Sequence, residues 1–359
     1  MKYQNNPDFS HQQHDKIGIL ITNLGTPDAP KKTELKRYLR EFLSDPRVVE
    51  IPRLLWWMIL NFVILNIRPR RSAKAYSTVW TERGSPLLFN TQDQADALRK
   101  KLHEKHGEAI TVEFAMRYGS PSVDSVIEKM LKGGVRKLLV LPLYPQYCAS
   151  TTASTFDAVA TSLATKRLIP ELRFINHYHD FPEYIQAVAD KIRQHWAVNG
   201  RADKLIFTYH GIPKRYLLNG DPYHCECYKT SRLLAENLGL TADEYMVTFQ
   251  SRFGREEWLQ PYTDKTLMAL PEQGIKSVQL VCPGFSSDCL ETIEEIGIEN
   301  HEYFIEAGGD RYEYIPALNA ESSHIDMMAN LLEQHLQGWS GFEDTAQRAE
   351  LAVKLGAKR

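Results

Sequence analysis

Short apolar runs alternate with amphipathic helical segments along almost the whole chain. The expected strands are runs such as 16–24 (KIGILITNL), 136–141 and 204–209, each followed by glycine, proline or a polar turn. Between them lie segments with a helical period, among them 123–131 and 182–198. Strands that alternate with helices form parallel sheets with helices on both faces. The sequence therefore predicts an α/β protein with doubly wound parallel sheets.

The other expected elements continue this alternation, and the two halves of the chain look alike. KIGILITNLG matches DKLIFTYHGIP in type, and GGVRKLLVLPLYP matches QGIKSVQLVCPGF. This similarity predicts two halves that face each other, with a cleft at the carboxyl ends of their strands. Further strands are expected at 110–114, 172–176, 245–250 and 277–281, and further helices at 33–42, 92–103, 154–163, 229–238, 263–270 and about 324–336.

We expect four parts along the chain. Polar tails occupy 1–16 and 337–359, and two compact halves occupy 17–175 and 176–336. The N-terminal half includes an apolar segment, 53–71, that is considered separately below.

Composition narrows the function classes. The 359 residues are enough for about two domains. Lys and Arg total 43 against 45 Asp and Glu, a net charge of −2. This balance argues against a nucleic-acid partner bound by bulk neutralisation of phosphates and leaves only a local basic patch for such binding. The five cysteines are too few for a disulfide framework, and residues 1–16 contain no apolar signal segment, so a cytoplasmic location is expected. No G-x-G-x-x-G or P-loop motif occurs, so nucleotide chemistry is unsupported.

The most apolar stretch is Leu54–Leu65 (LLWWMILNFVIL), in which Asn61 is the only polar residue. A transmembrane helix needs about 20 residues, so this stretch is too short to cross a bilayer. Its composition favours an element in a membrane interface, or at the lip of an apolar pocket, over a buried core helix. Cations border the stretch and two tryptophans lie near its start: Arg53, Arg68, Arg70, Arg71, Trp56 and Trp57.

Two polar groups follow expected strands and are candidates for chemistry. His210 comes directly after strand 204–209, where an imidazole can face a cleft; a satisfied turn histidine is the alternative. After strand 277–281 the pattern DCLETIEEIG becomes helical, and Glu291 and Glu295 share one face of that helix. Acidic residues in the first turn of a helix ordinarily stabilise the helix dipole. This role explains the presence of Asp288 well, but it explains the presence of Glu291 less well.

The cysteines offer weaker candidates. His224, Cys225 and Cys227 (HCEC) have metal-ligand side chains, but structural zinc usually needs four ligands in two spaced pairs, and no second pair follows. A metal role for this motif is therefore not favoured. The other three cysteines, Cys148, Cys282 and Cys289, are expected to be small packed residues rather than nucleophiles.

Several motifs in order resemble the ferrochelatase family over nearly all of residues 16–335. They are ILITNLGTPD (19–28), RGSPL (83–87), LPLYPQY (141–147), YHGIPKRY with GDPY (209–216 and 220–223), FQSRFG with Trp258 (249–254) and GFSSDCLETIEEI (284–296). The resemblance implies two Rossmann-like halves around a porphyrin cleft. It also implies an enzyme, a lyase that inserts Fe²⁺ into protoporphyrin IX with release of two protons, the terminal step of haem biosynthesis.

The resemblance assigns roles to particular residues. His210 and Glu291 match the histidine and glutamate that act in catalysis and contact the metal. Cys289 occupies the position at which the family pattern S-D-H-x-E has a second histidine. The part that this histidine plays in the metal or proton path therefore has no counterpart in this chain. Residues that match substrate-binding positions are Arg71 and Ser85 (propionates), Arg117 and Tyr118 (metal-facing side), and Trp258 and Phe285 (aromatic contacts with the macrocycle).

The family resemblance also sets expectations for partners and cofactors. Some members carry a [2Fe-2S] cluster on three C-terminal cysteines; this chain has no cysteine after 289, so no cluster and no permanently bound cofactor are expected. Leu54–Leu65 matches the family's active-site lip, which favours peripheral contact with the inner face of the membrane. Two alternatives remain: a ferrochelatase for coproporphyrin III, and a non-enzymatic haem or iron carrier on the same fold.

Overall fold

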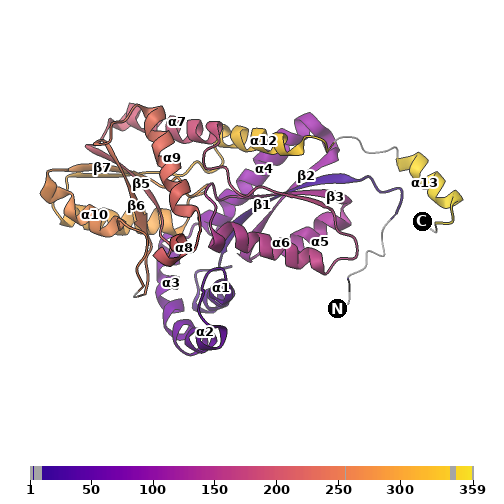
Figure 1. The fold of residues 1–359 in the computed structure, drawn as a ribbon, viewed down its shortest axis with the longest axis horizontal. Coiled ribbons are helices and arrows are strands. Elements are labelled where there is room, and N and C mark those ends of the chain that lie inside the picture. Colours follow the sequence, from indigo (N-terminus) through magenta and orange to yellow (C-terminus); the bar gives the residue numbers. More distant parts are fainter. Residues whose placement is uncertain (1–2, 4–9, 255, 340–344, 358–359) are drawn as a thin grey trace.

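The computed structural model describes residue 3 and residues 10–254, 256–339 and 345–357, so most of the expected tail at 1–16 lies outside the described residues. Two parallel sheets of four strands form the body of the molecule, one in each half of the chain (Figure 1). The first contains β1 (Lys16–Thr26), β2 (Ile110–Gly119), β3 (Val135–Pro142) and β4 (Glu171–Phe174). The second contains β5 (Lys204–His210), β6 (Tyr245–Gln250), β7 (Ser277–Val281) and β8 (Arg311–Ile315).

The two sheets have the same topology. Their strand orders are β2-β1-β3-β4 and β6-β5-β7-β8, and every neighbouring pair is parallel. The sequence pairs noted above occupy equivalent central positions, β1 with β5 and β3 with β7. In each sheet the chain leaves the first strand toward one edge and returns to the other side of it, which creates a topological switch point. The expected doubly wound α/β architecture is therefore confirmed.

Helices cover the faces of both sheets. In the first half they are α1 (Lys32–Ser44), α4 (Pro86–His106), η2 (Gly107–Ala109), α5 (Val123–Lys132), η3 (Ala149–Ala153) and α6 (Ser154–Ala164). In the second half they are α7 (Pro182–Asn199), α8 (Lys214–Leu218), α9 (Tyr223–Leu238), α10 (Thr263–Ala269), η4 (Pro271–Gln273), η5 (Glu291–Glu299) and α11 (Asn300–Glu306). The chain ends with α12 (Ser322–Leu336) and α13 (Thr345–Lys354), the latter inside the segment expected as a C-terminal tail.

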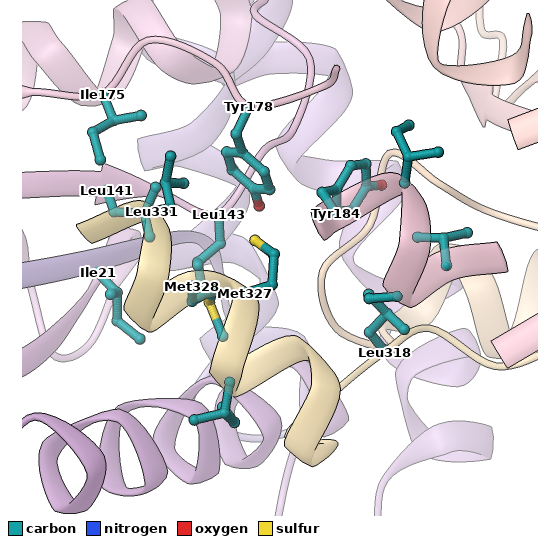
Figure 2. Packing of buried hydrophobic residues seen from close by; sticks show 14 of the residues in the cluster. Ile21, Leu141, Leu143, Ile175, Tyr178, Tyr184, Leu318, Met327, Met328 and Leu331 are labelled. Carbon is teal, nitrogen blue, oxygen red and sulfur yellow. The ribbon is translucent and has the colours of Figure 1, made fainter. Parts of the chain in front are cut away.

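One apolar core joins the two halves. Its members include Ile21 and Leu141 of the first sheet and Phe207 of the second. Helix α12 follows the second sheet in sequence but packs beside α4 of the first half (Figure 1). Figure 2 shows Met328 and Leu331 of α12 beside Ile21 and Leu141. Burial of such side chains stabilises the fold by about 1.5–3 kcal/mol each, so the halves support one another.

A projecting helical arm contains the apolar segment. It consists of α2 (Arg53–Ile59), η1 (Leu60–Ile64) and α3 (Leu65–Val79), seen below the sheets in Figure 1. One face is buried through Trp56, Leu60 and Leu65. The other face is exposed, so the segment is not a buried core helix. The exposed apolar residues are Leu54, Leu55, Trp57, Met58, Phe62, Val63 and Ile67. Among the described residues, no helix is both long enough and apolar enough to cross a membrane.

Two residues interrupt or complete the backbone pairing around the π-helical turn η1. Pro69 cannot donate the backbone hydrogen bond that the Leu65 carbonyl would accept, so regular helical pairing is interrupted just after η1. The Asn66 amide donates to the carbonyls of Phe62 at 2.9 Å and Asn61 at 3.2 Å, and so satisfies groups that the wider turn leaves open. The π turn also sets the five-residue spacing that keeps both Leu60 and Leu65 on the buried face.

Candidate active site

The strongest candidates lie at the switch point of the second sheet. His210 is the last residue of β5, and the loop after the neighbouring strand β7 leads directly into the π-helix η5, which begins at Glu291. In open α/β sheets, ligands bind at the carboxyl ends of the strands where the strand order reverses. The topology thus gives a physical reason for the positions of both His210 and Glu291.

The hydrogen bonds of His210 fix its tautomer. Nδ1 lies 2.7 Å from the carbonyl oxygen of Gly211, and a carbonyl only accepts, so Nδ1 carries the proton. Since Nδ1 is engaged in this way, Nε2 is the ring nitrogen that can bind a metal or accept a proton. The backbone is held as well, because the Tyr223 hydroxyl donates to the His210 carbonyl at 3.0 Å. His210 is partly exposed rather than a buried, satisfied turn histidine.

Gln250 connects the two candidate residues. It ends β6, pairs in register with His210, and its amide donates to the Glu291 carbonyl at 3.2 Å. The next residue, Ser251, has a φ of +67°, a left-handed conformation that costs a non-glycine residue about 1–3 kcal/mol. This conformation brings the Ser251 amide within 2.7 Å of Glu295 Oε1, and its hydroxyl donates to Oε2.

Glu295 holds its proton unusually tightly. Burial raises the pKa of Glu295 to about 8, and the negative charge of Glu291 adds to this, although the two hydrogen bonds from Ser251 act in the opposite direction. A carboxyl with a pKa near the working pH can both take up and release a proton there. The π-helix thus presents a carboxyl group suited to proton transfer next to Glu291.

Glu291 faces the helices of the first half. Its charge raises the pKa of the Tyr38 and Tyr76 hydroxyls, both of which are raised mainly by burial, and it favours the cationic form of Arg68. Burial is the larger effect on Arg68 and lowers the pKa of its guanidinium. Helix α3, which carries Arg68 and Tyr76, also packs against η5. The candidate site is therefore lined from both halves of the chain.

Aromatic side chains lie beside His210. The rings of His210 and Trp258 are 6.5 Å apart between centroids, and Phe253 lies 4.8 Å from Trp258. Trp258 is buried whereas Phe253 is exposed, and the Arg68 guanidinium lies 5.3 Å above the Phe253 ring. Phe285, in the loop after β7, is partly buried against the core of the second half. These rings offer apolar surface of the kind that a flat macrocycle needs.

Arg117 and Tyr118 occupy a buried polar network. The Tyr118 hydroxyl donates to Asp45 Oδ2 at 2.8 Å, and the Arg117 guanidinium contacts the same carboxylate and the Ser154 hydroxyl at 2.7 Å. Although burial alone would raise the pKa of the Asp45 carboxyl, hydrogen bonds from the Ser154 hydroxyl, the Arg47 backbone amide and the Tyr118 hydroxyl, together with the charge of Arg117, hold it below its usual value. The network joins α1, β2 and α6, and substrate binding by Arg117 and Tyr118 stays a prediction.

Ser85 and Arg71, the two residues expected to hold the propionates, have different environments. Ser85 is buried, and its hydroxyl accepts a hydrogen bond from Thr26 at 2.8 Å. Arg71 is exposed on α3, where its charge favours the ionised form of Glu294. Arg71 can meet a carboxylate in solvent, whereas Ser85 is already hydrogen-bonded inside the fold.

Asp288 and Cys289 have structural partners. The Asp288 carboxylate accepts hydrogen bonds from Tyr314 at 2.6 Å, Asn319 at 2.7 Å and Thr292 at 3.0 Å, which fixes the loop before η5. Cys289 is buried, and burial together with the adjacent Glu291 raises the pKa of its thiol, so it is a neutral packed residue. The burial of Cys289 agrees with the packed role expected from the sequence, whereas Asp288 fixes the loop through side-chain hydrogen bonds rather than through the helix dipole expected for it.

The HCEC motif does not form a metal site from its cysteines. Cys225 is exposed, Cys227 is fully buried, and the His224 ring stacks on Phe249 at 5.8 Å between centroids. Sequence reasoning missed Ser251 and Glu295 as site residues. A left-handed serine leaves no sequence signal, but Glu295 shared a predicted helix face with Glu291 and could have been taken as a candidate on that ground.

Two solved chelatase structures are similar to this chain. The chain is similar to SirB from Bacillus subtilis with Fe³⁺, with a TM-score of 0.53 and 13% identity over 90% of this chain and 97% of that chain. It is also similar to the sirohydrochlorin chelatase SirB from Bacillus subtilis subspecies spizizenii in complex with cobalt, with a TM-score of 0.51 and 12% identity over 92% and 100% of the two chains. At this identity the likeness establishes the fold alone, which is the chelatase fold.

Sequence relatives define the family more closely. The ferrochelatase family model matches residues 16–336. A protein named ferrochelatase from Pseudoalteromonas atlantica is 68% identical over 100% of both chains, and one from Idiomarina loihiensis is 69% identical over 99% of this chain and 98% of the other. The chain belongs to the ferrochelatase family, which confirms the resemblance seen in its motifs and its expected assignment as an enzyme.

Proposed function

We propose that this chain inserts Fe²⁺ into protoporphyrin IX, the terminal step of haem biosynthesis. The observation that carries the proposal is the arrangement at the β5–β7 switch point. There, His210 presents an Nε2 lone pair, and Gln250 links it to the acidic π-helix that begins at Glu291. Metal insertion has to remove two pyrrole protons and deliver one cation, and imidazole and carboxylate groups suit both tasks.

His210 and Glu291 are the proposed metal contacts and catalytic groups. Imidazole and carboxylate both bind Fe²⁺, and a sparse pair of ligands releases its metal more readily than a closed set of four. His210 Nε2 either binds the incoming iron or accepts a pyrrole proton. Glu291 completes the metal contact and passes a proton to Glu295, whose pKa of about 8 lets it exchange that proton with solvent.

The porphyrin plate is proposed to lie against Trp258, Phe253 and Phe285, with its propionates near the exposed guanidinium of Arg71. Stacking on aromatic walls and a charge-assisted contact at the rim suit a flat apolar plate with two carboxylates on one edge. A tightly fitting pocket can also distort the porphyrin ring toward the shape in which a pyrrole nitrogen lone pair points out of the ring plane.

The arm formed by α2, η1 and α3 is proposed to contact the membrane surface peripherally, on the cytoplasmic side. Its exposed apolar face includes Trp57 and Phe62, whose rings pack 5.9 Å apart, and exposed cations such as Arg53 and Arg70 border it. Apolar and aromatic side chains flanked by cations are typical of elements that insert into the headgroup region. The same arm lines the candidate site, so an apolar porphyrin could enter from the bilayer.

The test is an anaerobic insertion assay with Fe²⁺ and protoporphyrin IX, followed by loss of free-porphyrin fluorescence. Wild type should turn over. His210→Ala and Glu291→Gln should each lose about 100-fold or more in rate, in the range of a lost general acid–base group. Glu302→Gln, an exposed change on the neighbouring helix α11, is the matched control and should keep the wild-type rate. Tight porphyrin binding without turnover in wild type would instead support the carrier alternative.

The role of His210 is separable in the same assay. If Nε2 binds iron, a conservative variant such as His210→Asn raises the KM for Fe²⁺ more than it lowers kcat. If Nε2 accepts a proton, kcat falls and its dependence on pH changes.

Coproporphyrin III is the second candidate substrate. Its four carboxylates would need more cations around the pocket than α2 and η1 offer, because every exposed residue of these two elements except Arg53 is hydrophobic. The kcat/KM for the two porphyrins, measured side by side, decides between them, and a higher value for coproporphyrin III would overturn the choice made here.

A further inference from the structure

A second cluster of ligand side chains lies outside the candidate active site. Among the residues that the structure describes, His177, His179 and Glu226 form the one group of three or more His, Cys, Asp or Glu side chains with ligand atoms within 4.8 Å of one another. His177 and His179 follow β4, and Glu226 lies in the first turn of α9. The cluster therefore joins the end of the first sheet to the second half of the chain.

The local backbone explains why the side chains converge. Residues 175–178 are irregular and a turn begins at His179, and in this loop His177 and His179 both reach the Glu226 carboxylate. Figure 2 shows Tyr178 directed into the apolar core, near Tyr184. The buried Thr230 hydroxyl lies 2.9 Å from the His179 carbonyl and 3.0 Å from the Glu226 carbonyl, which ties the backbones of both residues together.

The carboxylate is already oriented toward both imidazoles. Glu226 Oε1 lies 2.7 Å from His177 Nδ1, and Oε2 lies 3.2 Å from His179 Nδ1. The Tyr147 backbone amide donates to Oε2 at 2.7 Å and holds the carboxylate in place. Ligands of a tetrahedral site with bonds of about 2.1 Å lie about 3.4 Å apart, so only small shifts of these side chains would be needed.

One atom of the cluster has no hydrogen-bond partner in the described part of the chain. His179 Nδ1 is buried, with only 5% of the side chain exposed, and its position beside Oε2 does not make a hydrogen bond. An unsatisfied buried nitrogen costs about 1–3 kcal/mol. The half-exposed His177 leaves an approach from solvent.

We propose that His177, His179 and Glu226 bind a first-row divalent transition metal ion such as Zn²⁺, Co²⁺ or Fe²⁺. Two imidazoles and one carboxylate are a ligand set that such ions accept, with the remaining positions filled by water. The proposal uses none of the residues assigned to porphyrin metallation. Bound metal would connect the loop after β4 to α9 and so stabilise the junction of the two halves.

The test measures Co²⁺ binding by equilibrium dialysis and by the visible absorption of the bound ion. The starting variant is His210→Ala, which removes a candidate active-site ligand. It should bind one equivalent of Co²⁺ with imidazole ligation, and a second change, His177→Ala, should abolish this binding. The matched control instead adds His103→Ala to His210→Ala. His103 is an exposed histidine outside the cluster, so this control should still bind one equivalent of Co²⁺. No bound Co²⁺ in His210→Ala, or full retention after His177→Ala, would overturn the proposal.

A second measurement covers the case in which a variant folds poorly. Without metal, the double variant should melt below His210→Ala, because Glu226 loses its His177 partner. Added Zn²⁺ should raise the melting temperature of His210→Ala but not of the double variant. Crystals of the wild type grown with Zn²⁺ should show anomalous density within bonding distance of His177, His179 and Glu226. Anomalous density confined to other places would refute the site, whatever the catalytic assays show.

Discussion

Glu295 provides the sharpest prediction, because its raised pKa changes how stability depends on pH. In the unfolded chain the carboxyl loses its proton near its ordinary pKa of 4.5, whereas in the folded protein it keeps the proton up to about pH 8. Between these values the folded state binds one more proton than the unfolded state. The stability contributed by this group is therefore fully present below pH 4.5, falls as pH rises, and is lost above pH 8.

The magnitude follows from one proton. Each pH unit in this window changes the free energy of unfolding by about 1.4 kcal/mol, so the two units from pH 5.5 to 7.5 remove about 2.7 kcal/mol. Glu295→Gln cannot titrate and removes this contribution. Its amide oxygen accepts one of the two hydrogen bonds from Ser251, and the loss of the other is the same at both pH values, so it cancels in the comparison.

The assay is urea unfolding of wild type and Glu295→Gln at pH 5.5 and 7.5, with circular dichroism and fluorescence as paired probes of a two-state transition. From pH 5.5 to pH 7.5, the free energy of unfolding should fall by about 2–3 kcal/mol more for wild type than for Glu295→Gln. Glu302→Gln, an exposed change, should behave as wild type. If the change in the free energy of unfolding with pH is the same for wild type and Glu295→Gln within about 0.5 kcal/mol, Glu295 is ionised in the folded protein. Glu295 could then not take up a proton from Glu291 as proposed.

Other features give further expected outcomes. Asp45→Ala leaves the cation and hydroxyls around that buried carboxylate without a partner and should cost about 3–5 kcal/mol in urea unfolding, whereas Asp157→Ala, in a half-exposed pair, should cost under about 1 kcal/mol. Gly211→Ala places a Cβ 2.8 Å from a backbone oxygen and should cost about 1–3 kcal/mol while lowering insertion activity. Replacing Trp57 and Phe62 by Ser should reduce co-sedimentation with anionic lipid vesicles at unchanged thermal stability; undiminished sedimentation would argue against membrane contact.

Much of the fold was predictable because its central strands are buried on both faces. Such strands appear as continuous apolar runs, and β1, β3, β5 and β7 all begin or end within about two residues of the expected positions. The edge strand β8 was missed because its sequence, RYEYI, is polar and only its last residue is buried. A strand that is buried on one face only, or on neither face, lacks the continuous apolar run from which strands are predicted in a sequence.

Site residues that follow the end of a strand could be predicted from the sequence. Site residues whose positions depend on an unusual backbone conformation, such as a π-helix, could not. His210 follows a buried strand, so its position could be inferred from the apolar run before it. The π-helix η5 was expected as an ordinary helix, because a wider turn has no distinct residue pattern. The convergence of His177 and His179 on Glu226 depends on how the loop after β4 meets α9, which a linear sequence does not display.

The most direct test of the account separates porphyrin binding from metal insertion in a single variant. Protoporphyrin IX affinity is measured by fluorescence titration, and the insertion rate by anaerobic single turnover with Fe²⁺, for wild type and Glu291→Gln. Porphyrin affinity of Glu291→Gln should stay within about 3-fold of wild type, and its insertion rate should be lower by about 100-fold or more, since the carboxylate acts on the metal and on the pyrrole protons rather than on the macrocycle. An unchanged insertion rate, or a loss of rate that matches the loss of affinity, would contradict the assignment of the β5–β7 switch point as the site of chemistry.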